Sequence, residues 1–198
     1  FENFPYGAGI FNRVIKVIKP TPSQIRTNDS KFCNIDNNLW VIFNSSNIRY
    51  MQHKNIIITG ATDGIGLAAA KSIAKKGYHV SLVGRNPDKG KKALEAIIEY
   101  SGNENLDFFE CDLSLVANVK DLADRIKQKH SKIDVLLNNA GGANKTKQIT
   151  SEGLEKTFAT NQMNYFVLST ELLNILSESN DGRIVNVASN AHIGAEVD

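Results

Sequence analysis

The sequence predicts an α/β fold in which helices cover both faces of one doubly wound parallel sheet, giving three layers (α/β/α). From residue 55 onward, short apolar runs alternate five times with helical patterns. The connections between the runs are helical crossovers, which force the strands to be parallel. A glycine-rich segment, TGATDGIG (59–66), overlaps the end of the first apolar run. Doubly wound sheets bind ligands at that end of the strand.

The five strands are expected where apolar residues run with little interruption. Such runs are typical of strands that are buried on both faces, as the strands of a parallel sheet are. In chain order they are NIIIT (55–59), HVSLVG (79–84), LDFFEC (106–111), KIDVLLNNAG (132–141) and GRIVNVAS (182–189).

Four helical patterns separate these strands. They cover about 65–76, 91–100, 115–126 and 152–176. The first ends at Gly77 and is expected to bury one face, made of Ile65, Ala68, Ala69, Ser72 and Ile73. The third is expected to begin at an N-cap, Ser114, and its apolar side holds Leu115, Val119, Leu122 and Ile126. The fourth is expected to break near Thr160.

The first 50 residues differ from the rest of the chain. They are rich in asparagine, hold three of the four prolines and show no sustained hydrophobic period. FNRVIKVIK (11–19) could form a short strand or an amphipathic turn, and LWVIF (39–43) could form a strand, but neither has a neighbour of matching pattern. We therefore expect an irregular extension over 1–50 and a partial nucleotide-binding domain over 51–198, with Met51 as a plausible start. An interfacial anchor in the extension is the alternative.

The composition is that of an ordinary globular protein. The 198 residues are 41% hydrophobic and 22% charged, with a formal net charge of +2. This balance gives no reason to expect a nucleic-acid partner, and no apolar run reaches the roughly 20 residues of a membrane span. The cysteines, Cys33 and Cys111, are too far apart in sequence to suggest a disulfide framework. We expect a cytoplasmic protein, with a peripheral position on an intracellular membrane as the alternative.

The glycines of TGATDGIG indicate a phosphate-binding turn. A helix N-terminus offers unpaired N–H groups and about half a positive charge, and a pyrophosphate is attracted by both. Gly60 would permit the tight turn, Gly64 would let the backbone approach the phosphate, and Gly66 would let the helix pack closely on the sheet. A glycine-rich turn without a ligand is the alternative.

Five segments in unbroken order, over roughly 55–194, resemble the short-chain dehydrogenase/reductase family, and most closely its retinol-dehydrogenase-like and X-linked dehydrogenase/reductase-like branch. They are TGATDGIG, CDL (111–113), NNAG (138–141), EGLEKTFATNQMNYFVL (152–168) and RIVNVASNAH (183–192). The resemblance implies a Rossmann-like fold, here incomplete at its C-terminal side, in which Asn139 also braces the sheet. It implies a cofactor site that includes Gly60, Thr62, Asp63, Gly64, Ile65, Gly66, Asp112, Leu113, Asn139, Ala140 and Gly141.

The position about twenty residues after the glycine motif predicts which nicotinamide cofactor binds. NAD enzymes place an Asp or Glu there to bind the ribose 2′-hydroxyl, whereas this chain has Gly84 followed by Arg85. An arginine can pair with a 2′-phosphate through two hydrogen bonds. We therefore expect NADP (NADPH) rather than NAD. Asp63 weakens this expectation slightly, because some NADP-binding relatives carry a basic residue at that position.

The resemblance also implies hydride transfer between the nicotinamide and an alcohol or carbonyl carbon. Ser189 matches the catalytic serine that hydrogen-bonds the substrate oxygen, and Asn161 matches the asparagine that holds a water in the proton relay. The family's proton-transferring tyrosine, with a lysine one helical turn later, should follow Ser189. Residues 190–198, NAHIGAEVD, contain neither, so we expect a truncated chain that is inactive as written.

Other catalytic arrangements have little support in the sequence. Tyr50 and Lys54 have the Tyr-x-x-x-Lys spacing, but they precede the first strand, whereas the expected site lies beyond its far end. Ser189 lacks the flanking glycines of a hydrolase nucleophile elbow. The four histidines show no metal-ligand spacing and are expected to be solvated or locally hydrogen-bonded, so no metal site is predicted.

Two functions from different classes remain open. The first is an NADP-dependent oxidoreductase acting on a small-molecule alcohol or carbonyl that is retinoid-, steroid- or otherwise lipid-like. The second is a non-catalytic nucleotide-binding or interaction protein on the same fold. A homo-oligomer is compatible with the resemblance, and membrane association has no support in the sequence.

Overall fold

The computed structural model describes residues 30–36, 39–44 and 54–189. By its internal contacts the chain divides into two units, Phe1–Gln52 and His53–Asp198. In the first unit, β1 (Ser30–Asp36) pairs antiparallel with β2 (Leu39–Asn44). The segment 39–43, which could form a strand by its sequence, is part of β2. Its partner β1 lacks a matching pattern in the sequence because polar residues interrupt the apolar ones. The segment 11–19 lies outside the described residues.

The second unit is built on a five-stranded parallel sheet with the order β5-β4-β3-β6-β7. The order reverses at the central strand β3, so a crevice at the carboxyl ends of β3 and β6 is the expected place for a ligand. The parallel, doubly wound sheet predicted from the sequence is therefore confirmed. The strands are β3 (Asn55–Thr59), β4 (His79–Gly84), β5 (Leu106–Glu110), β6 (Val135–Asn138) and β7 (Arg183–Asn186).

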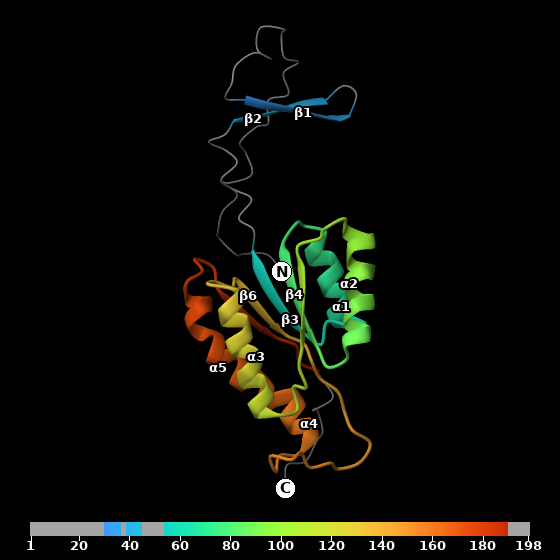
Figure 1. Ribbon diagram of the computed structural model, residues 1–198, viewed down its shortest axis with the longest axis vertical. Helices are drawn as coiled ribbons and strands as arrows, with labels where there is room; N and C mark the ends of the chain where they lie inside the picture. Colours follow the sequence, from blue (N-terminus) through green and yellow to red (C-terminus); the bar gives the residue numbers. More distant parts are fainter. Residues whose placement is uncertain (1–29, 37–38, 45–53, 190–198) are drawn as a thin grey trace, which may run out of the picture. The chain divides into compact units, whose positions relative to one another are not determined.

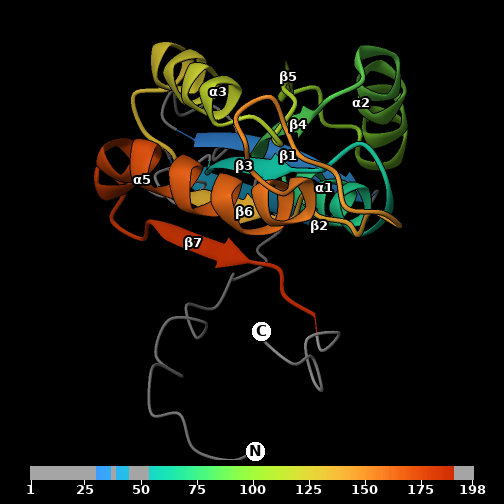
Figure 2. The same ribbon diagram turned by 90° about the horizontal axis from the view of Figure 1, so that it is seen from below.

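Helices cover both faces of this sheet, and each face has its own hydrophobic core. In Figure 1, the green helices α1 and α2 lie on one side of the sheet and α3 and α5 on the other. Seen from below in Figure 2, β7 forms one edge of the sheet. The helical segments are α1 (Gly64–Ala74), α2 (Pro87–Ser101), α3 (Val116–Lys129), α4 (Lys156–Phe158), the π-helical turn η3 (Ala159–Met163) and α5 (Asn164–Ser177).

Among the described residues, none of the helices has the length and hydropathy needed to cross a membrane.

The buried face of α1 matches the predicted one only in part, because Ile73 packs against the core but three other residues of that face are exposed. Ile65 is 73% exposed, and Ala68 and Ser72 are exposed as well. The helix instead buries its smallest side, Gly66, Ala70 and Ala74. Small residues on that side let the helix axis approach the sheet closely. The close packing that results stabilises the fold more than burial of the Ile65 side chain would.

The N-terminus of α3 is capped by a residue from a distant part of the chain. The Glu152 carboxylate accepts hydrogen bonds from the N–H groups of Val116 (2.6 Å) and Ala117 (2.9 Å). Ser114, the expected cap, instead donates its hydroxyl to Asp112 Oδ1 at 2.8 Å. The prediction of the cap was wrong because a carboxylate brought in by the fold satisfies the first-turn N–H groups. The predicted apolar side of this helix is buried, with Val119, Leu122 and Ile126 fully enclosed.

Candidate active site

Two glycines of the turn between β3 and α1, Gly60 and Gly66, leave no room for a side chain. Gly60 adopts a left-handed conformation, with φ 64°, and a Cβ there would lie 2.8 Å from Cα of Ala140. A Cβ on Gly66 would overlap the carbonyl oxygen of Gly60. The chain can therefore make this turn, and α1 can lie this close to it, only without side chains at both positions. These are the steric roles that the sequence predicts for the two glycines.

The third glycine leaves the outer face of the turn open. A Cβ on Gly64 would meet no heavy atom within 4 Å. The first intrahelical bond of α1 runs from Leu67 N–H to the Asp63 carbonyl, so the N–H groups of residues 64–66 precede it. The Asp63 carboxylate accepts the first of them, from Gly64, at 2.8 Å. The N–H groups of Ile65 and Gly66 remain within a first turn suited to an anion, and this arrangement fits the pyrophosphate of a dinucleotide.

Asp63 adds a negative charge beside this turn, and a lysine from the next helix offsets it. Lys89 Nζ lies 3.5 Å from Asp63 Oδ2, and both side chains are largely exposed. The N–H of Gly64 and the charge of Lys89 hold the pKa of Asp63 below its usual value. Sequence reasoning missed Lys89. Its position in the first turn of α2, four residues after Arg85, was the available signal.

The end of β6 is tied to the glycine turn by hydrogen bonds. Thr59 Oγ1 accepts from the N–H groups of Asn139 (2.9 Å) and Ala140 (3.0 Å). The Asn139 side-chain amide donates to the carbonyls of Thr59 (3.0 Å) and Gly60 (3.2 Å). Thr59 is fully buried and did not figure among the predicted site residues. The structure thus brings NNAG and TGATDGIG together and fixes one against the other.

Arg85 follows β4 at the same edge of the sheet and is exposed. A Cβ on the preceding Gly84 would lie 2.7 Å from Cγ2 of Thr62, so the end of β4 lies against the glycine turn. Arg85 directly follows this end of β4, and Lys89 pairs with Asp63 of the turn; this is the region where the sequence predicts that the 2′-phosphate binds.

The segment after β5 divides into an exposed residue and a buried one. Leu113 is only 7% exposed and belongs to the core under α3 and α5, whereas Asp112 is exposed. Partial desolvation raises the pKa of Asp112, but hydrogen bonds from Ser114 and the charges of Arg85 and Lys156 outweigh it and hold the pKa below its usual value. Asp112 is therefore ionised at neutral pH.

Asn161 lies in the π-helical turn η3, which is the break expected near Thr160. The N–H of Asn164 bonds to the carbonyl of Ala159, five residues back. Asn161 Oδ1 accepts from the N–H of Gly142, and its Nδ2 donates to the Gly142 carbonyl, both at 2.9 Å. The side chain thus holds the loop that follows β6. π-Helical turns inside helices are frequent at functional sites.

Ser189 lies beyond the end of β7 and is exposed. The direction of the chain toward it is set by Asn138, whose Nδ2 donates to Asn186 Oδ1 (2.8 Å) and Ser169 Oγ (3.1 Å). The N–H of Val187 also bonds to the Asn138 carbonyl at 2.9 Å. The segment that carries Ser189 therefore leaves the sheet beside the end of β6, at the same edge as the glycine turn.

Lys54 and His130, which the sequence does not predict to belong to the active site, make contacts elsewhere in the fold. Lys54, half of the Tyr-x-x-x-Lys pair, forms an ion pair with Asp181 at 3.0 Å, before β3 begins; Tyr50 lies outside the described residues. Of the two states expected for the histidines, solvated or locally hydrogen-bonded, His130 has the second: it is buried and its Nε2 lies 3.4 Å from the Ser81 hydroxyl. It lies with His79 beside one carboxylate, because strand pairing and the end of α3 bring together residues that are distant in sequence.

Comparisons with known proteins agree with this geometry. A family model described as short chain dehydrogenase matches residues 54–195. The chain is 41% identical over 133 residues to dehydrogenase/reductase SDR family member 12 of Bos taurus (67% of this chain, 42% of that protein). It is 36% identical to polyprenol dehydrogenase (71% and 44%) and 31% identical to retinol dehydrogenase 13 (73% and 44%), both of Homo sapiens.

A solved short-chain dehydrogenase from Shigella flexneri 2a, complexed with NADP, superposes with a TM-score of 0.62 at 29% identity. That superposition covers 72% of this chain and 62% of that one. The chain therefore belongs to the short-chain dehydrogenase/reductase family, with retinol-dehydrogenase-like proteins among its relatives. It spans less than half the length of the curated relatives named above.

Proposed function

We propose that this protein is an NADP(H)-dependent oxidoreductase. The observation that carries the proposal is the glycine turn Gly60–Gly66, which is fixed against Asn139 and Ala140 at the ligand-binding edge of the sheet and left open at Gly64. A bound nicotinamide dinucleotide would supply or accept the hydride. The first turn of α1 would hold its pyrophosphate, and the segment after β6 would border the rest of the cofactor.

The preference for NADP(H) rests on charge. Arg85 follows β4, Lys89 pairs with Asp63 of the glycine turn, and no carboxylate follows β4 directly. A guanidinium can pair with a phosphate through two hydrogen bonds, while an ammonium adds a point charge. Asp63 opposes this preference, but its exposed carboxylate is already engaged by Lys89 and by the Gly64 N–H.

The substrate we propose is a lipid-like alcohol or carbonyl compound. The support is the names of two relatives, a polyprenol dehydrogenase and a retinol dehydrogenase. In this assignment Ser189 hydrogen-bonds the substrate oxygen. Asn161 keeps the loop after β6 in place through Gly142, and its Oδ1 has a second lone pair with which to hold a water of the proton relay.

Cofactor binding is tested by titrating the chain with NADPH and NADH in a calorimeter. We expect NADPH to bind more tightly, and Arg85→Ala or Lys89→Ala to weaken NADPH binding by about 10-fold each while leaving NADH almost unchanged, since each removes one charged contact of roughly 1.4 kcal/mol. Arg183→Ala, which removes an arginine that pairs with Asp181 instead, is the matched control. Tighter binding of NADH would contradict the assignment of Arg85.

Turnover separates the two functional classes. Residues 190–198 supply neither a tyrosine nor a lysine, so we expect the 198-residue chain to bind NADPH without oxidising it in the presence of retinal or other carbonyl compounds. Clear turnover by this chain would contradict the idea that its proton-transfer pair is missing. Turnover only by a gene product that includes a Tyr-x-x-x-Lys after Ser189 would support the enzyme over a non-catalytic binding protein.

A further inference from the structure

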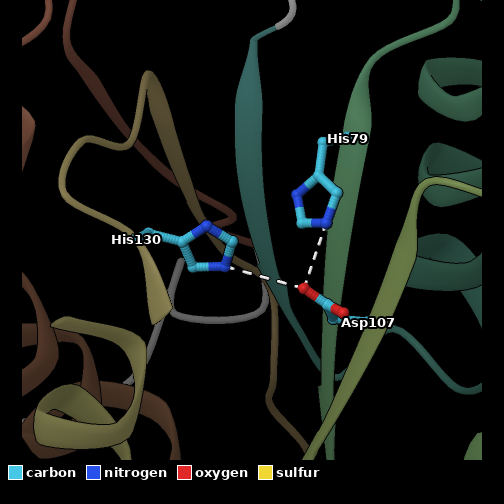
Figure 3. Close-up of side chains that lie close together, drawn as sticks. All are labelled: His79, Asp107 and His130. Carbon is cyan, nitrogen blue, oxygen red and sulfur yellow. Dashed lines mark ion pairs between the residues drawn. The ribbon is translucent and has the colours of Figure 1, made fainter. Parts of the chain in front are cut away.

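Three side chains with metal-binding atoms converge at the amino-terminal edge of the sheet, away from the candidate active site. His79 is the first residue of β4, Asp107 is the second residue of β5, and His130 directly follows α3. In Figure 3 both imidazole rings face the Asp107 carboxylate. The three residues thus join three elements that only the tertiary fold brings together.

The distances within this cluster suit a shared cation. His79 Nε2 lies 3.0 Å and His130 Nε2 3.7 Å from the same oxygen, Asp107 Oδ2, and one ligand atom from each residue lies within 4.8 Å of the others. Around a tetrahedral zinc ion, with bonds of about 2.0–2.2 Å, neighbouring ligand atoms are about 3.4 Å apart. The two nitrogen–oxygen distances lie on either side of that value.

Direct hydrogen bonding accounts less well for the same arrangement. Only the contact from His79 has the length of a good hydrogen bond, because N–H···O bonds extend to about 3.2 Å. The buried Ser81 hydroxyl lies beside the cluster at similarly long distances, 3.4 Å from His130 Nε2 and 3.5 Å from Asp107 Oδ2. The rings lie 5.1 Å apart with a tilt of 54°, so they do not stack. One short contact and two longer ones therefore converge on Asp107 Oδ2.

The surroundings favour ligation through one carboxylate oxygen. Lys129 pairs with the other oxygen, Asp107 Oδ1, which leaves Oδ2 directed at the two rings. The side chains are only 20% (His79), 14% (Asp107) and 8% (His130) exposed, so their orientations are restricted by packing. Imidazole nitrogens with a carboxylate oxygen form a ligand set that zinc and similar transition-metal ions accept.

We propose that His79, Asp107 and His130 form a binding site for a zinc-type divalent cation, with a water as the fourth ligand beside Ser81. The ion would connect β4, β5 and the end of α3, and would therefore stabilise the fold. The proposed site lies at the opposite end of the strands from the glycine turn, so the ion would take no part in hydride transfer. This site is independent of the function proposed above.

The test uses the 198-residue chain, purified without a polyhistidine tag and treated with EDTA. Zinc added at 100 times its dissociation constant should raise the Tm by about 5–10 °C. Cobalt(II) should give the visible absorption bands of a tetrahedral ion with nitrogen and oxygen ligands. His130→Gln and His79→Gln should each weaken zinc binding by roughly 100-fold or more, beyond the effect of losing an outer-shell partner.

Control variants separate a loss of zinc binding from a loss of folding. His53→Gln removes a histidine that is not one of the three proposed ligands, and it should bind zinc as the parent chain does. The Tm of every variant in EDTA shows whether it folds, and Asp107→Asn provides a second test that retains the residue's shape. Absence of zinc binding up to millimolar metal would overturn the proposal, as would equal affinity in the parent and the His130→Gln chain. NADPH affinity, measured in parallel, should not depend on zinc.

Discussion

At the residue scale, single atoms determine which glycines of the turn between β3 and α1 have room for a side chain. A Cβ on Gly66 would meet the backbone carbonyl of Gly60, which cannot rotate away as a flexible side chain could. A Cβ on Gly64 would meet nothing, so this glycine leaves space on the outer face of the turn. The same short segment therefore contains one glycine required by packing and another whose open side is suited to a ligand.

The substitution Gly66→Ala tests this distinction. Alanine is favoured in a helix by about 1 kcal/mol, but the overlap with a backbone oxygen should prevail and give a net loss of about 2 kcal/mol in the free energy of unfolding. Gly142→Ala is the matched control, because a Cβ there also meets nothing within 4 Å, and it should change stability by less than about 0.5 kcal/mol. Urea unfolding measures both, and equal effects would contradict the packing role of Gly66.

Asp134 is a buried carboxylate whose hydrogen bonds make stability depend on pH. It accepts from Ser179 Oγ (2.6 Å) and from the N–H of Asn55 (2.8 Å). Burial raises the pKa of Asp134, but these two bonds and the charge of Lys132 outweigh it and hold the pKa below its usual value. The ionised form therefore stabilises the fold above the unfolded pKa of about 3.9. That contribution is lost as the pH falls through the lower pKa that Asp134 has in the folded protein.

We accordingly expect Asp134→Asn to lower the free energy of unfolding by about 1.5–3 kcal/mol at pH 7, and the difference from the parent to shrink below about pH 4. Asp124→Asn, which removes an exposed ion pair with Lys127, should cost less than about 1 kcal/mol. Urea unfolding at several pH values measures this. If the free energy of unfolding of Asp134→Asn stayed below that of the parent by the same amount at low pH, the charge of Asp134 would not be the cause.

At the element scale, helix ends and breaks are set by partners from other parts of the chain. The first turn of α3 is capped by Glu152, and Asn161 in η3 holds the loop after β6. The expected break near Thr160 was visible in the sequence, whereas the carboxylate that caps α3 was not. The segment between these contacts is therefore held at Gly142 by the side chain of Asn161 in η3 and at Glu152 by the first turn of α3.

Glu152→Ala should destabilise the protein by about 1 kcal/mol, the cost of losing an N-cap. Hydrogen exchange at the amides of Val116 and Ala117 should become faster, because those N–H groups lose their acceptor. Ser114→Ala is the control, since Ser114 bonds to Asp112 and not to the first turn; exchange at the same two amides should be unchanged. Faster exchange in Ser114→Ala alone would restore Ser114 as the cap.

At the scale of the whole molecule, the sheet order places the candidate site. Because β3 lies between β4 and β6, the segments after these three strands meet at one edge. The sheet, both cores and every candidate cofactor residue lie within the unit His53–Asp198. The division expected between 1–50 and 51–198 stays a prediction about folding and function.

Removing residues 1–52 tests that division. We expect the remaining chain to keep its cooperative thermal transition, to within a few degrees, and its NADPH affinity, because the residues that bind and pack are retained. Differential scanning calorimetry and the NADPH titration measure the two properties. Loss of the transition on removal would mean that the N-terminal unit contributes to the stability of the second.

The sequence by itself determined the parallel sheet, the crossover helices, and the positions of Gly60 and Gly66. These follow from local rules, namely the period of apolar residues and the conformations that only glycine adopts easily. It also marked the break of the last helix near Thr160.

Only the tertiary structure decided which side of α1 is buried, that Glu152 caps α3, that Lys89 meets Asp63, and that His79, Asp107 and His130 share one place. The physical reason is that these contacts join residues far apart in the chain. Their distances are set by how helices and strands pack, and no local pattern of residues records that packing.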